Sequence, residues 1–151
     1  MTEEQDFLTC LQQYEDAAGR FGTGDAEPVK AFFAKGDITL LSGVGGYFRG
    51  WEDVSSHLDR AASQFSGTTE HAWAYEPIHT GVDGELAYAV VIEREQGVDV
   101  AGGDSSVVRE LRATLIFRRQ NGEWKLVHRH ADPLASERSA AELFRSMPSH
   151  G

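Results

Sequence analysis

Apolar side chains in the first part of the chain recur at the spacing of a helix. The first series lies on one helical face: Phe7, Leu11, Tyr14, Ala18 and Phe21. This spacing predicts a helix over residues 3–22, ended by the following glycines. A short helix with Pro28 in its first turn and a strand over residues 38–41 come next. After a glycine-rich loop, apolar positions at helical spacing predict a third helix over about 51–65.

The second half of the chain changes to the two-residue alternation of strands. Four strands are predicted, over residues 69–80, 85–100, 107–119 and 124–130. Glycine-containing turns separate them, and Asn121-Gly122 between two apolar runs strongly indicates a hairpin. Residues 135–147 could form a terminal helix or fray. Helices followed by an antiparallel meander predict the α+β fold class.

Composition and charge are those of one globular domain. The chain has 151 residues, of which 40% are hydrophobic and 25% charged, enough for one core. Because no repeat or linker interrupts it, residues 1–151 are predicted to form a single domain. The net charge of −10 would repel phosphate backbones, so no nucleic-acid partner is expected.

The sequence also indicates a compartment. The first residues lack the basic start and apolar run of a signal peptide. No apolar stretch approaches the ~20 residues that a membrane span requires, so no membrane partner is expected. Cys10, the single cysteine, allows no intrachain disulfide and lies in an apolar stripe. We therefore expect a cytoplasmic protein in which Cys10 is a core residue.

Several local motifs occur in a familiar order. Gly24-Asp25 joins the first two helices, Gly50-Trp51 opens the third, and residues 111–119 and 121–130 form a closing hairpin. Over about residues 5–132 this order resembles the SnoaL-like domains of the NTF2-like superfamily, which includes ketosteroid isomerases and the calmodulin-dependent kinase association domain. The resemblance implies a cone-shaped, cystatin-like fold, with N-terminal helices packed on a curved antiparallel sheet around an apolar pocket. Residues 133–151 would form a tail or helix.

Strand alternation and this resemblance together place two sets of side chains toward the pocket. The first set is Ala87, Ala89, Val91 and Glu93, and the second is Arg112, Thr114, Ile116 and Arg118. Small alanines would leave room for a ligand. Glu93 could pair with Arg112, or could lie in a solvated strand end. Because an unpaired buried guanidinium is unfavourable, Arg112 indicates a small carbonyl or carboxylate ligand if no protein carboxylate pairs with it.

The last strand leaves open which face lines the pocket. His128 and His130 share one face, Arg129 and Ala131 share the other, and a bulge would exchange them. His130 beside Asp132 could be a general base held by a carboxylate, or a structural imidazole.

Aromatic residues supply further candidates for the pocket. Trp73, together with His71 and Tyr75, could line the pocket or a dimer interface. By the resemblance, Tyr14 and Trp51 lie near the pocket mouth, where they could bind ligand or pack in the core.

The ketosteroid isomerase template does not carry over to this chain. By local alignment its base falls on Ser42, its oxyanion acid on Thr114 and its tyrosine near Ala17, one turn after Tyr14. A serine requires its own activator, so steroid isomerisation by the usual mechanism is not expected. The catalytic candidates are His130, Asp132 and Glu93, for a cofactor-independent isomerase, dehydratase or hydrolase. We expect no cofactor and no metal.

Two kinds of function remain open. The first is a small-molecule-binding protein with a pocket for a carbonyl or carboxylate compound. The alternative is a non-enzymatic association module, suggested by the closing hairpin that resembles the kinase association domain. Both predict a homodimer, because an exposed apolar sheet face favours a partner.

Overall fold

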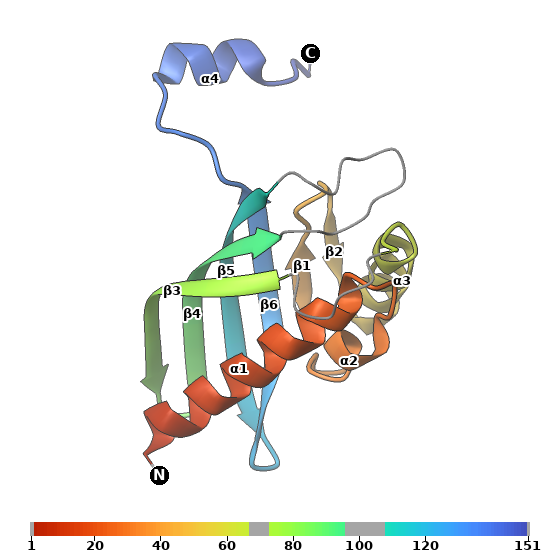
Figure 1. Cartoon of the computed structure of the whole chain (residues 1–151), viewed down its shortest axis with the longest axis vertical. Helices are drawn as coiled ribbons and strands as arrows, with labels where there is room; N and C mark the ends of the chain where they lie inside the picture. Colours follow the sequence, from red (N-terminus) through yellow and green to blue (C-terminus); the bar gives the residue numbers. More distant parts are fainter. Residues whose placement is uncertain (1, 67–72, 96–107, 151) are drawn as a thin grey trace.

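Helices pack on one face of a curved sheet in the computed structural model, which describes residues 2–66, 73–95 and 108–150 (Figure 1). The helices are α1 (Glu3–Phe21), α2 (Glu27–Lys30), α3 (Trp51–Ala62) and α4 (Ala140–Ser146). The strands are β1 (Thr39–Leu41), β2 (Tyr47–Arg49), β3 (Trp73–Asp83), β4 (Leu86–Glu95), β5 (Arg109–Gln120) and β6 (Glu123–Pro133). This architecture confirms the predicted α+β fold with N-terminal helices on a curved sheet.

The strands form one mixed sheet in the order β2-β1-β6-β5-β4-β3. The four long strands make the predicted antiparallel meander, whereas β1 pairs parallel with β6. The glycine-rich segment was expected to be a loop only, and this was wrong for residues 47–49. Gly45 and Gly46, with φ of +105° and +76°, turn the chain so that β2 pairs antiparallel with β1.

Helix α1 fills much of the hollow side of the sheet. Thr2 and Gln5 form a capping box at its start, and its apolar face is buried. Phe7 packs edge-on against Phe117, with ring centroids 5.3 Å apart. Figure 1 shows the helix running across the long strands.

The small residues of β4 lie beneath this helix. Ala87 and Ala89 are at most 1% exposed and belong to the main core. The expectation that they leave room for a ligand is therefore wrong. Both alanines belong to the same buried cluster as Phe7, Leu11 and Tyr14 of α1.

A β-bulge in β6 settles which of its residues face the core. Phe117 pairs with Leu126 but the preceding Ile116 pairs with His128, so Val127 is the extra residue. After the bulge, Arg129 shares the inward face with Leu126. The sequence left open whether His128 and His130 or Arg129 and Ala131 face inward. In the structure Arg129 and the fully buried Ala131 do.

The remaining boundaries differ from the predictions by a few residues. Helix α3 ends at Ala62 instead of 65, and α4 lies within the predicted 135–147. The predicted parts of strands at 69–72 and 96–100, the turn at 102–104 and His71 lie outside the described residues. Helix α4 buries no residue and stands away from the sheet in Figure 1. Among the described residues, no helix combines the length and apolarity needed to cross a membrane.

Candidate functional site

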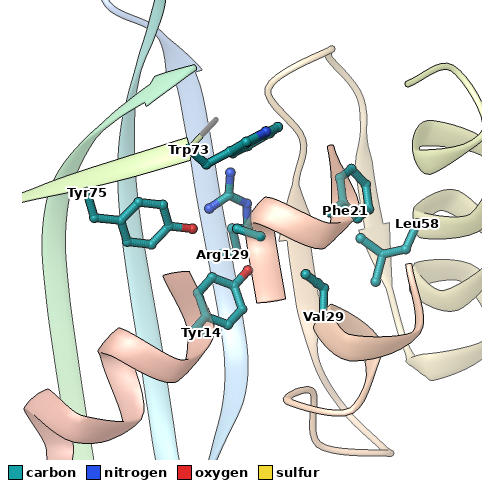
Figure 2. A pocket seen from close by; sticks show the side chains of 8 residues that line it. Tyr14, Phe21, Val29, Leu58, Trp73, Tyr75 and Arg129 are labelled. Atoms are coloured by element: carbon teal, nitrogen blue, oxygen red, sulfur yellow. The ribbon is translucent and has the colours of Figure 1, made fainter. Parts of the chain in front are cut away.

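A pocket of about 460 Å³ lies where β1 and α3 meet the ends of the long strands. Its apolar wall includes Phe21, Leu40, Leu58, Ala61, Phe65 and Trp73. Its polar groups include Ser42, His57, Glu95, Arg109, Glu110 and Arg129. A recess of about 60 Å³ shares four of these lining residues and extends to Tyr14 and Tyr75 (Figure 2). An apolar cavity of this size with a few polar groups is typical of a small-molecule site.

Arg129 forms a buried ion pair with Glu93 below the pocket. Its two terminal nitrogens donate to the two carboxylate oxygens at 2.5 and 2.9 Å. The side chains are 14% and 0% exposed, respectively. Burial opposes the charge of the guanidinium, but the carboxylate of Glu93 outweighs it, so the pKa of Arg129 lies well above its ordinary value. Arg129 is therefore a fixed positive charge in the pocket.

Two tyrosine hydroxyls point toward this guanidinium. Figure 2 shows Tyr14 from α1 and Tyr75 from β3 converging on Arg129. Burial raises the pKa of Tyr14 to about 12, although Arg129 acts in the opposite direction. Burial, reinforced by the charge of Glu93, also raises the pKa of Tyr75 well above its usual value. Both phenols therefore stay protonated at neutral pH and can donate a hydrogen bond.

His57 and Ser42 form a second polar pair in the pocket wall. His57 Nε2 lies 2.9 Å from Ser42 Oγ, and the imidazole stacks on Phe48 with ring centroids 4.1 Å apart. The imidazole is only 7% exposed. Burial, followed by the charge of Arg60, lowers the pKa of His57. The ring is therefore neutral at pH 7, and one of its nitrogens can accept a proton.

Glu95 is a buried carboxyl group that titrates near neutral pH. It is 8% exposed and lines the same pocket as His57. Burial, then the charge of Glu93, raises its pKa from 4.5 to about 7, against the effect of Arg129 and Arg109. About half of the molecules thus carry a proton on Glu95 at neutral pH, so that this group can give or take one.

Four of the predicted site residues lie together on the outward face of the sheet. His130 does contact Asp132, at 3.0 Å between Nε2 and Oδ2, and Arg112 lies 3.9 Å from the same carboxylate. Their side chains are 43–61% exposed. Thr114 pairs with His130 in the neighbouring strand and shares this face. The expectation that they face the pocket is therefore wrong.

The reason is strand register. The inward residues of β5 are Ala113, Leu115 and Phe117, all buried, and a shift of one position exchanges the two faces. The expected pairing of Glu93 with Arg112 is wrong for the same reason, since Arg129 of β6 pairs with Glu93 instead. Ile116 and Arg118, predicted to point inward, alternate with the buried residues.

The other predicted residues are divided between the pocket and its surroundings. Tyr14 and Trp73 line the pocket or its recess, and Glu93 holds Arg129 beneath it. Trp51 packs near Phe33 and under Lys35, whose Nζ lies 3.5 Å from its ring centroid. Trp51 is therefore not part of the pocket lining.

Some pocket residues were missed, although the sequence carried a signal for two of them. His57 shares the apolar face of α3 with Val54, Leu58 and Ala61 at helical spacing. Glu95 continues the inward alternation of β4 two positions after Glu93. No comparable signal marked Arg129, because it depends on the bulge. In the described parts of the chain, no three His, Cys, Asp or Glu side chains are grouped to hold a metal ion.

Solved structures with the same fold come from several bacteria. A ketosteroid isomerase-like protein from Erwinia carotovora atroseptica SCRI1043 has a TM-score of 0.72 at 13% identity, covering 90% of this chain and 100% of that one. A provisionally assigned dehydratase of the NTF2-like family from Streptomyces avermitilis has a TM-score of 0.65 at 19% identity, covering 89% and 100%. At these identities the similarity shows the fold alone.

A third structure belongs to a different functional group. It is a provisionally assigned calcium/calmodulin-dependent protein kinase type II association domain from Thiobacillus denitrificans ATCC 25259, with a TM-score of 0.65 at 20% identity, covering 81% of this chain and 93% of that one. No curated protein matches the chain. The family model of the SnoaL-like domain matches residues 9–136, which include all the pocket residues named above. The chain therefore belongs to the SnoaL-like domain family.

Proposed function

We propose that the protein binds a small organic molecule, with its apolar body against the pocket wall and a carbonyl or carboxylate group near Arg129. The observation that carries this proposal is one pocket of about 460 Å³ that joins an apolar wall to a fixed guanidinium. A guanidinium has five N–H donors, and the contact with Glu93 uses two of them. The hydroxyl of Tyr14, whose oxygen accepts a hydrogen bond from Arg129, adds a further donor for a ligand oxygen, whereas the hydroxyl of Tyr75 is engaged with Glu93.

The charge of Glu95 should make the affinity for a carboxylate ligand depend on pH more than the affinity for a neutral carbonyl ligand. Above pH 7 its carboxylate adds a negative charge to the pocket, which opposes a ligand carboxylate. Below pH 7 Glu95 is protonated and that opposition is removed. Carboxylates should therefore bind more tightly as the pH falls from 8 to 6, whereas a neutral ketone should respond less.

The proposal is tested with a matched pair of probes, 4-phenylbutanoate and 5-phenylpentan-2-one, by isothermal titration and thermal shift. Arg129→Lys should weaken binding of both probes about tenfold or more, since an ammonium cannot pair with Glu93 through two nitrogens and still offer the remaining N–H donors of a guanidinium to the probe. Ala61→Phe, which fills the pocket, should also weaken it. Arg112→Lys on the outward face is the control and should change nothing. Lack of binding by both probes, or equal losses in the control, would refute the proposal.

The second candidate function is a proton-transfer reaction of the isomerase or dehydratase kind. The pocket is lined by a proton acceptor, the neutral imidazole of His57, and by a proton donor, the carboxyl group of Glu95 with a pKa of about 7. One can accept a proton while the other donates one. Turnover of a carbonyl substrate should then show a bell-shaped pH profile, and Glu95→Gln should remove its alkaline limb.

The association role is favoured by a different surface. On β3 and β4, Ile78, Leu86 and Tyr88 are 57%, 47% and 39% exposed, on or beside the outward face of the sheet. We infer that two copies of the chain pair through this face, because clustered apolar side chains are more stable when covered. This role is compatible with an occupied pocket, because none of these three residues lines it.

A further inference from the structure

The hydroxyl of Ser42 is placed as an activated nucleophile would be. Ser42 follows directly after β1, and its Oγ lies 2.9 Å from Nε2 of His57 on α3. Both side chains line the pocket of about 460 Å³. The sequence argued against chemistry at Ser42 because a serine requires an activating base, and the fold supplies that base from a helix 15 positions further along the chain.

The hydrogen bonds around Ser42 leave its proton free to point at His57. The backbone N–H of Val44 donates to Ser42 Oγ at 3.3 Å, so the oxygen acts as the acceptor there. The neutral imidazole of His57 has one acceptor nitrogen. When Nε2 is that acceptor, the serine O–H donates to it, which is the arrangement that precedes proton removal.

The surroundings hold the imidazole in place and leave the oxygen accessible. His57 stacks on Phe48 with an interplanar angle of 18° and is 7% exposed, which restricts rotation of the ring. The next residue, Gly43, also lines the pocket and has no side chain to cover Ser42. The positive charge of Arg129 in the same pocket favours an oxyanion.

We propose that Ser42 and His57 act as a nucleophile and general base, and that the small molecule bound in the pocket is a carboxylic ester with an apolar acyl group. This inference rests on the proposed function, since it places the acyl group against the apolar wall. None of the contacts of His57 in the described residues is with a carboxylate that would offset its lowered pKa, so the base is weaker than an ordinary imidazole. An ester, with its better leaving group, therefore suits the pair more than an amide.

The chemical steps balance without a cofactor. Ser42 Oγ forms a bond to the ester carbonyl carbon, its proton passes to His57 Nε2, and the carbonyl π electrons move to oxygen. The intermediate collapses by breaking the bond to the alcohol oxygen, which takes the proton from His57. Water then attacks the acyl-serine in the same way, giving the carboxylic acid and restoring the Ser42 hydroxyl.

The test uses the full chain with 4-nitrophenyl butanoate as substrate and phenylmethanesulfonyl fluoride as covalent probe. We expect saturable release of nitrophenolate and a single sulfonyl adduct on Ser42, located by peptide mass spectrometry. Ser42→Ala and His57→Gln should each lower kcat/KM about 100-fold or more. Ser63→Ala, an exposed serine at the end of α3, is the matched control and should keep full activity.

A binding measurement separates failure of this inference from failure of the proposed function. Thermal shift with 4-phenylbutanoate is repeated on the wild type and on Ser42→Ala, which also shows that the variant is folded. If the probe binds but Ser42 is not acylated or sulfonylated, or if Ser42→Ala keeps the esterase rate, the inference is overturned and the proposed function stands. If neither binding nor acylation occurs, both are overturned.

Discussion

The buried ion pair between Glu93 and Arg129 leads to a sharp prediction about stability. Arg129→Met keeps an apolar side chain of similar reach but removes the positive charge. The Glu93 carboxylate, which is 0% exposed, then remains in the core without its counterion. Either an uncompensated charge stays buried or the carboxylate must take up a proton, and both states disfavour the folded chain.

The size of the loss follows from burial. Removing one member of a buried pair typically costs about 3–5 kcal/mol, and because Arg129 is 14% exposed to the pocket we expect about 3 kcal/mol. For a chain of this length, this corresponds to a fall in Tm of about 6–12 °C. The double variant Glu93→Leu/Arg129→Met buries no charge, and should lie within about 1 kcal/mol of the wild type.

The assay is equilibrium unfolding in urea at pH 7.5, followed by tryptophan fluorescence and circular dichroism. Agreement of the two signals and an unchanged m-value would validate the comparison of free energies. Arg112→Met is the matched control, because its side chain is 61% exposed on the outward face. Its free energy of unfolding should change by no more than about 0.5 kcal/mol.

Two results would refute the reasoning. The first is that Arg129→Met loses no more stability than Arg112→Met. The second is that the double variant Glu93→Leu/Arg129→Met loses as much stability as Glu93→Leu and Arg129→Met lose separately when added together. Additive losses would mean that the two partners do not stabilise each other in the core.

Three further predictions address other parts of the molecule. Between pH 4.5 and about 7 the folded chain keeps a proton on Glu95 that the unfolded chain has released, so this group's contribution to stability falls by about 3 kcal/mol as the pH rises through that window and is constant above it. We expect the free energy of unfolding, measured in urea at several pH values, to fall less with rising pH in Glu95→Gln than in the wild type. An identical pH dependence in the two proteins would contradict this prediction. Asn121 has a positive φ of 52°, so Asn121→Val should cost about 1–2 kcal/mol and Asn121→Gly much less, measured by thermal denaturation. Equal losses would show that the turn is not constrained. Light scattering should find a homodimer that Tyr88→Glu dissociates, and a monomeric wild type would exclude the proposed pairing.

Much of the fold could be predicted from local sequence because its signals are local. The apolar spacing of α1 and the Asn-Gly turn between β5 and β6 each depend on a few neighbouring residues. Strand β2 could not be predicted in this way, since its three residues are stabilised mainly by pairing with β1. The spacing of its own side chains carries too little information over three positions.

The candidate site was harder to predict because it depends on register and on contacts between distant segments. The face of β5 was assigned one residue out of phase, which moved Arg112 and Thr114 to the wrong side. The contact between Ser42 and His57 joins the end of a strand to a helix, and no local pattern encodes their distance. Trp73 was left open between the pocket and a dimer interface, and Tyr14 between ligand binding and core packing; both line the recess, and both could be named as candidates because their elements were predicted in the right order.

The extra residue in β6 has a consequence for comparing this protein with its relatives. Every position of the strand after Val127 has the opposite parity from the one that simple alternation would give it. A relative with the same residues but no bulge would turn the imidazoles of His128 and His130 toward the hollow and the Arg129 guanidinium to the outward face. A bulge in the last strand can therefore alter the chemistry of the hollow without any substitution, and relatives should be grouped by the presence of this bulge before their pocket residues are compared.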